Sequence, residues 1–168
     1  MPMTVSQVLG AQPGAVVDAA DTVSMSANAA DFYIGGQRRC LSDLDESWNG
    51  AASETAGTQG AVLVSQQEAY RAKLVAIQQV LSTGGNQLVE LRSQLHSVVT
   101  GDASRYWMIG DDGSVFPGAL LQEYASFSPA AELEVTLMAT QLSVQIRLLL
   151  AHFELADSQT AQALRTFA

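Results

Sequence analysis

The sequence has little cysteine and little positive charge. Cys40 is the single cysteine among 168 residues, and one thiol forms no disulfide within the chain, so the fold does not depend on an oxidising compartment. Lys and Arg number 8 against 17 Asp and Glu, which gives a formal net charge of -9. A protein with this charge is repelled by phosphate backbones, so nucleic acid is not a predicted partner.

Targeting signals and long apolar runs are also missing. We find no uninterrupted apolar run near the roughly 20 residues that a transmembrane helix needs, so the sequence predicts no integral membrane segment. Residues 1–6 lack the basic and apolar regions of a signal peptide. If the protein is secreted or reaches the cell envelope, we expect a signal-peptide-independent route, with the protein cytoplasmic before export.

Motifs for catalysis are absent too. His96 and His152 fall on different predicted helices without paired Cys or carboxylate spacing, and no Gly-x-Ser-x-Gly elbow or phosphate loop is present. The pair Asp111-Asp112 raises the possibility of a calcium site, but it lacks the spaced ligands of an EF-hand, so a plain turn is favoured. The sequence therefore predicts no enzyme, no catalytic residue, no metal site and no cofactor.

What the sequence does contain is helical spacing of apolar residues on both sides of Trp48-Asn49-Gly50. Residues 13–47 carry an apolar seam with steps of four and three, which is interrupted at Gln37 and ends at Trp48. Its members are Val16, Ala20, Val23, Ala27, Ala30, Ile34, Leu41, Leu44 and Trp48. Such a seam predicts a long helix lying antiparallel to a neighbour. Gly50 permits the positive φ of a tight reversal, so we predict a helix–Trp-x-Gly–helix hairpin.

The second helix of the hairpin is predicted over residues 51–99. Its seam comprises Tyr70, Leu74, Ile77, Leu81, Gly84, Leu88, Leu91, Leu95 and Val98. The stretch 82–86, with the pair Gly84-Gly85, could divide this helix in two. We favour one continuous helix because the apolar phase is the same on both sides of the stretch.

The remaining segments are short except for the last. Thr4 is a candidate cap for a short helix over residues 4–9. Residues 105–117 predict a β-hairpin around an Asp-Gly turn, and residues 119–127 a short helix. From Pro129 toward Ala168 a long helix carries two apolar stripes. One stripe comprises Leu133, Leu137, Thr140, Val144, Leu148, Ala151 and Leu155; the other comprises Leu142, Ile146, Leu149, Phe153, Ala156, Ala163 and Phe167. Such a helix either lies in the middle of a bundle or offers a face to another chain.

These elements, in this order, carry a resemblance. The alanine-rich helix, the Trp48-x-Gly50 elbow followed by Ala51-Ala52, the second long helix and the Asp-Asp-Gly-Ser-Val hairpin resemble the WXG-type N-terminal domains of actinobacterial, particularly mycobacterial, type VII (ESX) secretion substrates. The fold class predicted is mainly α: an elongated antiparallel helical bundle built on the hairpin, with a small β-hairpin and a long C-terminal helix. Residues 1–168 would form one such domain, the N-terminal part of a longer effector.

The resemblance also implies a function and partners. The domain would be a non-catalytic type VII secretion targeting and partner-binding module, paired with another WXG-type helical hairpin or recognised by a secretion ATPase. The alternative is a cytosolic helical chaperone or antitoxin-like protein that holds a partner. The acidic charge and the two-sided last helix support this alternative. The oligomeric state is left open.

The candidate recognition residues are Trp48, Gly50, Phe153 and Asp157. Substrates of this kind carry a Tyr-x-x-x-Asp/Glu signal, and no tyrosine here has an acid four residues on; the nearest match is Phe153 with Asp157. The spacing places both on one helix face, where they would be presented together. The alternative, held equal, is that Phe153 belongs to the core and Asp157 is a solvated charge. Trp48 likewise either forms part of a recognition surface or packs between the helices, and the two roles are compatible.

Overall fold

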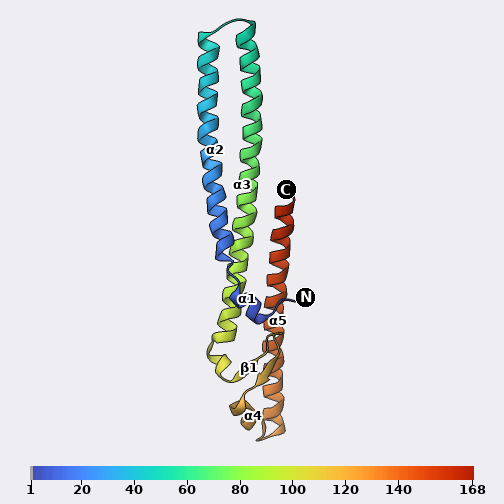
Figure 1. The fold of residues 1–168 in the computed structure, drawn as a ribbon. Helices are drawn as coiled ribbons and strands as arrows, with labels where there is room; N and C mark the ends of the chain where they lie inside the picture. The colour runs from blue at the N-terminus through green and yellow to red at the C-terminus, as the bar shows by residue number, and fades with distance from the viewer. Residues whose placement is uncertain (1) are drawn as a thin grey trace. The chain divides into compact units, whose positions relative to one another are not determined.

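The computed structural model describes residues 2–168, except for the side chains of residues 102 and 103. The fold is mainly α, with one two-stranded antiparallel sheet and a long C-terminal helix, as the sequence predicts (Figure 1). Contacts between residues group the chain into two compact units. The first unit comprises residues 1–14 and 84–162, and the second comprises residues 15–83 and 163–168. Each unit is described separately below.

The second unit contains the helical hairpin. Helix α2 spans Gly14–Ser47 and helix α3 spans Ala51–Thr100, and they run antiparallel beside each other from the elbow (Figure 1). The seam predicted for α2 faces inward, since Ala20, Ala27 and Ile34 are buried. Two ion pairs join the helices, Arg38 with Glu68 and Arg71 with Asp31. Both pairs are solvent-exposed, so they orient the helices more than they stabilise them.

The seam predicted for α3 is correct only in part. Tyr70 lies 61% exposed, so the start of the predicted seam is wrong. Ser53 and Val64 are buried in its place, and the partly covered positions between and beyond them include Gly57, Gly60, Gln67, Arg71 and Leu74. These residues keep the steps of four and three but include few apolar side chains, so hydropathy alone did not reveal the phase.

Helix α3 continues without a break through Gly84-Gly85. The favoured continuous helix is confirmed, and the glycine at position 84 has a packing role within the first unit. A Cβ atom at Gly84 would collide with the side chain of Thr160. Because glycine has no side chain, Gly84 permits a close approach of α3 and the last helix.

Helix α1 spans Val5–Gly10 in the first unit, and its ends are well satisfied. Thr4 is the N-cap, and a capping box with Gln7 pairs the free backbone donors of the first turn. At the other end the Leu9 carbonyl accepts from Nε and Nη2 of Arg92 on α3, at 3.1 and 2.8 Å. Val5 and Val8 belong to the core. Six residues are too few for an independent helix, so these contacts hold α1 in place.

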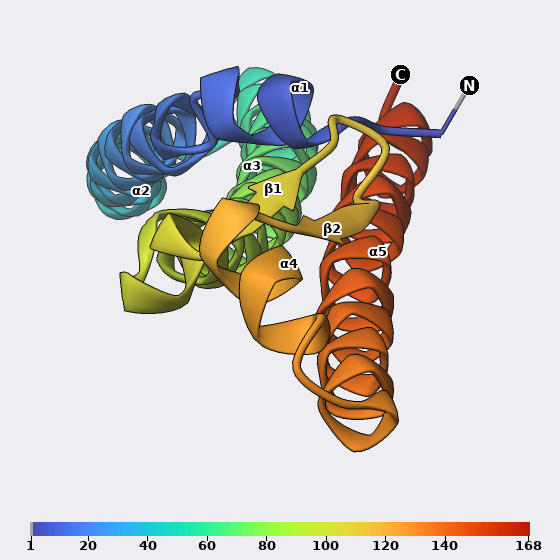
Figure 2. The ribbon, with the colours of Figure 1, turned by 90° about the horizontal axis from the view of Figure 1, so that it is seen from below.

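The β-hairpin follows a 3₁₀ turn, η1 (Asp102–Arg105), that the sequence analysis did not predict. Strands β1 (Trp107–Ile109) and β2 (Val115–Pro117) pair antiparallel, with Met108 opposite Phe116. Gly113 adopts φ +78° in the turn. The hairpin lies against the last helix, with α1 on one side of it and helix α4 (Ala119–Ala125) on the other (Figure 2).

The core of the first unit forms where α1, α3, the β-hairpin and helix α5 (Pro129–Arg165) meet. Leu95 of α3 and Ile146 of α5 are fully buried there. The other core residues are Val5, Val8, Leu88, Leu91, Val115, Leu150, Phe153 and Ala156. One of the two stripes predicted on α5 thus faces this core through Ile146, Phe153 and Ala156, whereas the other lies at the surface.

We expect Leu95→Ala to lower the free energy of unfolding by about 2–5 kcal/mol, because it leaves a cavity at a fully buried position. Urea denaturation followed by circular dichroism measures the effect. Leu120→Ala on α4 is the matched control, because this leucine is 64% exposed, and it should change stability by less than about 0.5 kcal/mol. Equal effects of the two substitutions would contradict the core described here.

Candidate protein-binding surface

The Trp48-Asn49-Gly50 elbow has the geometry predicted for a tight reversal. Helix α2 ends at Ser47 and α3 begins at Ala51, and Gly50 between them has φ +128°. The Gly50 carbonyl accepts from the Glu54 amide at 3.0 Å, which starts the hydrogen-bond ladder of α3. A residue with a Cβ atom adopts this φ only with strain. Glycine is therefore required here by the backbone.

Trp48 is held by its backbone and leaves its side chain partly exposed. Its amide donates to the Leu44 carbonyl at 2.9 Å, and its carbonyl accepts from Oγ of the buried Ser53 at 2.5 Å. The indole itself is 45% exposed. A large apolar side chain fixed at an exposed helix end suits contact with another protein. Both roles considered for Trp48 remain compatible with this placement.

Phe153 and Asp157 are placed differently from each other. Phe153 is 4% exposed and belongs to the core of the first unit, whereas Asp157 is exposed on the outside of α5. This placement matches the alternative in which Phe153 is a core residue and Asp157 a solvated charge. The aromatic ring is not presented at the surface beside the carboxylate. Recognition through Asp157 stays a prediction.

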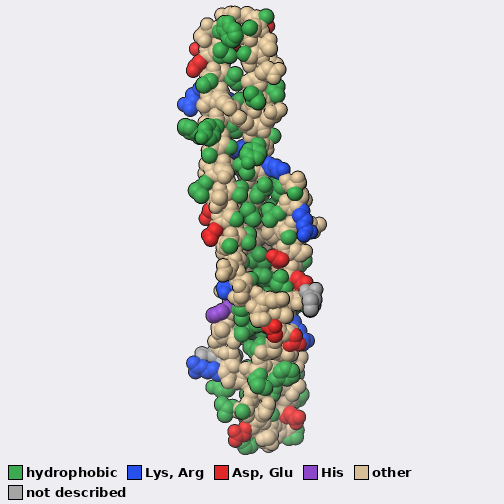
Figure 3. Space-filling model, in the orientation of Figure 1, with side chains coloured by type: hydrophobic (Ala, Val, Ile, Leu, Met, Phe, Trp, Pro, Cys, Tyr) green, Lys and Arg blue, Asp and Glu red, His purple; other side chains and the backbone are tan. Residues whose placement is uncertain are grey.

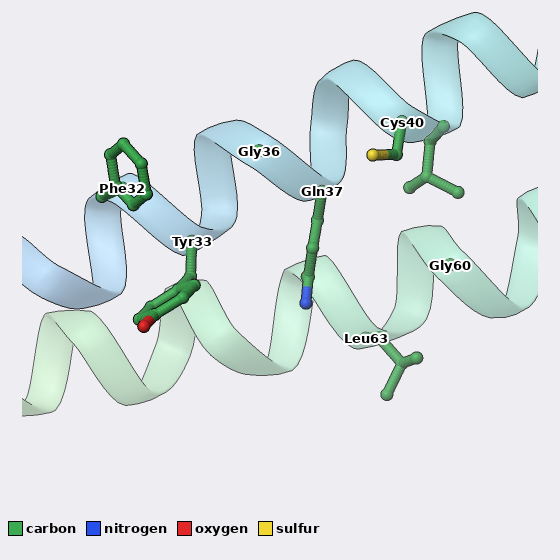
Figure 4. A pocket seen from close by; sticks show the side chains of 8 residues that line it. Phe32, Tyr33, Gly36, Gln37, Cys40, Gly60 and Leu63 are labelled. Carbon is green, nitrogen blue, oxygen red and sulfur yellow. The ribbon is translucent and has the colours of Figure 1, made fainter.

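An apolar groove between α2 and α3, which we call the hairpin groove, was not predicted from the sequence. It encloses about 480 Å³ and is open to solvent; its lining residues are Phe32, Tyr33, Gly36, Gln37, Cys40, Leu41, Gly60 and Leu63. Figure 4 shows Tyr33 and Gln37 reaching from α2 toward α3, with Cys40 farther along α2. Phe32 and Tyr33 form an edge-to-face pair with centroids 6.0 Å apart.

The groove lies where α2 and α3 meet at a glycine. A Cβ atom at Gly60 would collide with Leu41, so the two helices approach closely at this glycine. Phe32, Tyr33 and Leu63 lie more than half exposed beside this contact. Hydrophobic side chains consequently stand among few charges on the hairpin surface (Figure 3). Exposed apolar surface of this kind indicates protein contact.

Polar atoms at the floor of a neighbouring hollow lack partners. This hollow is lined by Ala30, Tyr33, Gln37, Gln67 and Tyr70. The side-chain oxygens of Gln37 and Gln67 are buried there without a hydrogen-bond partner among the described residues. An unpaired buried oxygen costs about 1–3 kcal/mol, so these two acceptors lower the stability of the hairpin at this point. The interruption of the α2 seam at Gln37 was the sequence signal for this feature.

The acidic turn serves the packing of the first unit. Asp111 accepts from the Ser6 amide at 2.7 Å and from Ser6 Oγ at 3.0 Å. These hydrogen bonds, the backbone one first, hold the pKa of Asp111 below its usual value. Hydrogen bonds from Ser114, and then the nearby Arg147 guanidinium, lower the pKa of Asp112 in the same way. Both carboxylates are thus engaged within the turn and with α1 and α5.

Among the residues that the structure describes, no three His, Cys, Asp or Glu side chains are arranged to hold a metal ion. Outside this turn, the pKa of Tyr124 is raised, because its phenol donates a hydrogen bond to the carboxylate of Glu134 at 3.2 Å. Neither feature forms a cluster of converging reactive groups.

One described helix, α5, is apolar and long enough to cross a membrane by length and composition alone. Only 17% of its most apolar 18-residue window is buried in the protein. The prediction of no integral membrane segment considered only uninterrupted apolar runs, and it stays a prediction. Comparisons with protein-family models, with curated proteins and with solved structures gave no match to this chain.

We expect Gly50→Ala to lower the free energy of unfolding of the hairpin by about 1–3 kcal/mol, because alanine at φ +128° is strained. Gly57→Ala is the matched control, since it lies inside α3 with open space around its Cβ position. That substitution should raise stability by up to about 1 kcal/mol through helix propensity. Urea denaturation measures both, and a stabilising Gly50→Ala would contradict the elbow geometry.

We expect Asp111→Asn to loosen α1, with a dependence on pH. Since folding lowers the pKa of Asp111, its stabilising effect is fully present above the unfolded pKa of about 3.9 and is lost as pH falls through the lower folded value. Amide exchange in residues 5–10 should be faster in the variant at neutral pH, and the difference should shrink below about pH 4. A difference that persists unchanged in acid would contradict this role.

Proposed function

We propose that this protein is a targeting and partner-binding module of type VII secretion, without chemistry of its own. The observation that carries the proposal is the elbow: a reversal that requires glycine, at φ +128°, beside a tryptophan whose indole is 45% exposed, between two long antiparallel helices. This arrangement fits the WXG-type domains that the sequence resembles. Export would follow a signal-peptide-independent route.

The partner in this proposal is a protein, either another WXG-type helical hairpin or a secretion ATPase. The hairpin groove supports this, because it is apolar, open and bordered by exposed aromatic rings. A helix laid along it would cover the rings of Phe32 and Tyr33, which are 73% and 67% exposed. Helices bind grooves in this way through apolar anchor residues spaced by three and four.

A second candidate is a cytosolic protein that holds a partner, in the manner of a chaperone or an antitoxin. The hairpin groove supports this candidate equally, because its lining does not include the Trp48-Asn49-Gly50 elbow. A partner could bind the groove in the cytosol without any export machinery. The two functions differ in what the elbow does. In the cytosolic function Trp48 serves only to pack, whereas in the secretion function it is read by another protein.

Export of the full chain from an actinobacterial host with a type VII system separates the two. We expect Trp48→Ala to reduce the secreted fraction at least about 10-fold, the loss expected for a central aromatic anchor, while the protein accumulates folded in the cytoplasm. Tyr106→Ala is the control, because Tyr106 is an aromatic residue of similar exposure, at 48%, that belongs neither to the elbow nor to the lining of the hairpin groove. Normal export of a folded Trp48→Ala variant would overturn the targeting role.

Asp157 is tested in the same assay without disturbing the core. Asp157→Ala removes the exposed carboxylate and leaves Phe153 buried, so a specific loss of export would assign recognition to this end of α5. Glu154→Ala, an exposed acid one turn earlier, is its control. Unchanged export of both variants would remove Asp157 from the recognition surface and leave the elbow as the tested signal.

A further inference from the structure

Helix α5 carries a second apolar face that nothing in its own unit covers. We call it the outer stripe; it comprises Leu133, Leu137, Thr140, Val144, Leu148, Ala151 and Leu155. Its four leucines and its valine are 53–60% exposed. Ile146 and Phe153 on the opposite side of the helix are buried in the core. The helix is therefore apolar on two opposite faces, of which one lacks a partner.

The spacing of the outer stripe is the same in both chain directions. Its residues follow each other in steps of four, three, four, four, three and four, which is symmetric about Val144. These steps sum to 22 residues over six turns, close to 3.7 per turn, so the stripe stays on one side of a nearly straight helix. A symmetric stripe of this kind suits an antiparallel pair of identical helices, in which each side presents the same surface.

We propose that the outer stripe binds a second copy of this chain, with the two α5 helices antiparallel and a two-fold axis at Val144. In this pairing Val144 meets Val144 of the second copy. Leu137 meets Ala151, which places a large residue against a small one, and Leu133 meets Leu155 at each end of the contact. Alternation of large and small residues lets facing helices interdigitate. The proposal concerns a different surface from the hairpin groove and does not depend on the secretion function.

The flanks of the outer stripe are compatible with this pairing. On one side of the stripe, about 80° from Val144 on a helix of 100° per residue, lie Glu134 and His152. In the antiparallel pair Glu134 of one copy comes within about 3 Å, along the axis, of the level of His152 of the other. Carboxylate and imidazole form a hydrogen-bonded pair in either protonation state of the ring. Glu134 also accepts from Tyr124, which fixes its orientation.

The other flank brings no like charges together. Arg147, which pairs with Asp112 at 3.5 Å, comes within about 1.5 Å, along the axis, of the level of Thr140 of the second copy. The two Arg147 residues would be six residues apart along the axis, or about 9 Å. Glu154 comes within about 3 Å of the level of Thr136 of the other copy, and Glu134, which is at its own level, lies on the opposite flank. The acidic and basic side chains are thus placed so that no two like charges come close together on one flank of the antiparallel pair. Two identical surfaces do not generally avoid such repulsion.

The size of the contact sets the expected strength. The outer stripe runs for about 33 Å along a helix about 10 Å across. Two such faces together bury on the order of 1,000 Å², near the lower limit of specific interfaces. We therefore expect a reversible dimer with a dissociation constant on the order of micromolar.

A lipid membrane is the less suitable occupant, although α5 is apolar enough to cross one. The inner face of α5 packs against a two-stranded sheet and α1, and sheet edges with unpaired backbone groups are not accommodated in lipid. Helices that lie on a membrane surface carry Lys and Arg along the polar flanks. The flanks here carry Gln141, Gln145 and two glutamates with a single arginine.

Sedimentation of the full chain between about 1 and about 100 μM tests the dimer. We expect a shift from monomer to dimer over this range. Val144→Glu should raise the dissociation constant at least about 100-fold, because it brings two carboxylates together on the axis. Val62→Glu is the matched control: Val62 is a similarly exposed helical valine on α3, away from the outer stripe, and its substitution should leave the dimer intact.

Disulfide cross-linking tests the direction and the register. In a Cys40→Ser background, Val144→Cys should cross-link with itself under mild oxidation. Leu155→Cys alone should not, because the two positions lie about 33 Å apart in the antiparallel pair. A mixture of Leu133→Cys and Leu155→Cys chains should yield the mixed dimer. Efficient self-linking of Leu155→Cys would indicate a parallel pair and overturn the proposal.

Two further outcomes would also overturn it. One is a chain that stays monomeric at about 100 μM, well above the expected dissociation constant. The other is a chain that binds vesicles of phosphatidylcholine and phosphatidylglycerol through the outer stripe, so that Val144→Glu abolishes vesicle binding and leaves sedimentation unchanged. That result would assign the stripe to a lipid surface.

Discussion

The close approach of α2 and α3 at Gly60, in a seam that also contains the buried alanines Ala20 and Ala27, determines most of what the hairpin presents to its surroundings. Alanine and glycine bury little apolar area, so such a seam gives the hairpin little hydrophobic stabilisation per turn. Gly60, against which Leu41 packs, leaves no room for a larger side chain. Phe32, Tyr33 and Leu63 consequently lie outside, where they border the hairpin groove. A hairpin built in this way has more apolar surface to offer a partner than a bundle with leucine at its centre.

In the first unit, helix α5 likewise leaves large apolar side chains exposed, because only one of its two apolar faces is packed. One face completes a core with Leu95 and Val8, in which side chains are fully buried and well supported by the capped helix α1. The outer face carries comparable apolar residues but packs against nothing within its unit. The free energy of folding of this unit therefore comes from one side of the helix, and the other side contributes only when something covers it.

Much of the fold could be predicted from the sequence because the helices carry long, regular patterns. The limits of the helices, the Thr4 cap, the reversal at Gly50 and the β-hairpin all follow from local spacing and turn chemistry. The seam of α3 was misassigned at Tyr70, because the covered positions before Leu74 include Ser53, Gly57 and Gln67 and so carry little hydropathy signal. The hairpin groove was missed for the same reason. A groove over glycine is a property of two facing helices, and neither helix shows it alone.

Cys40 gives this arrangement an experimental use. It is the one thiol of the chain, it is solvent-exposed, and it lines the hairpin groove beside Gly36 and Gly60 (Figure 4). A fluorophore or spin label attached to it needs no mutagenesis and reports from inside the groove. Because a bound helix would exclude water from the label and restrict its rotation, emission or line shape would register occupancy in real time and in crude mixtures.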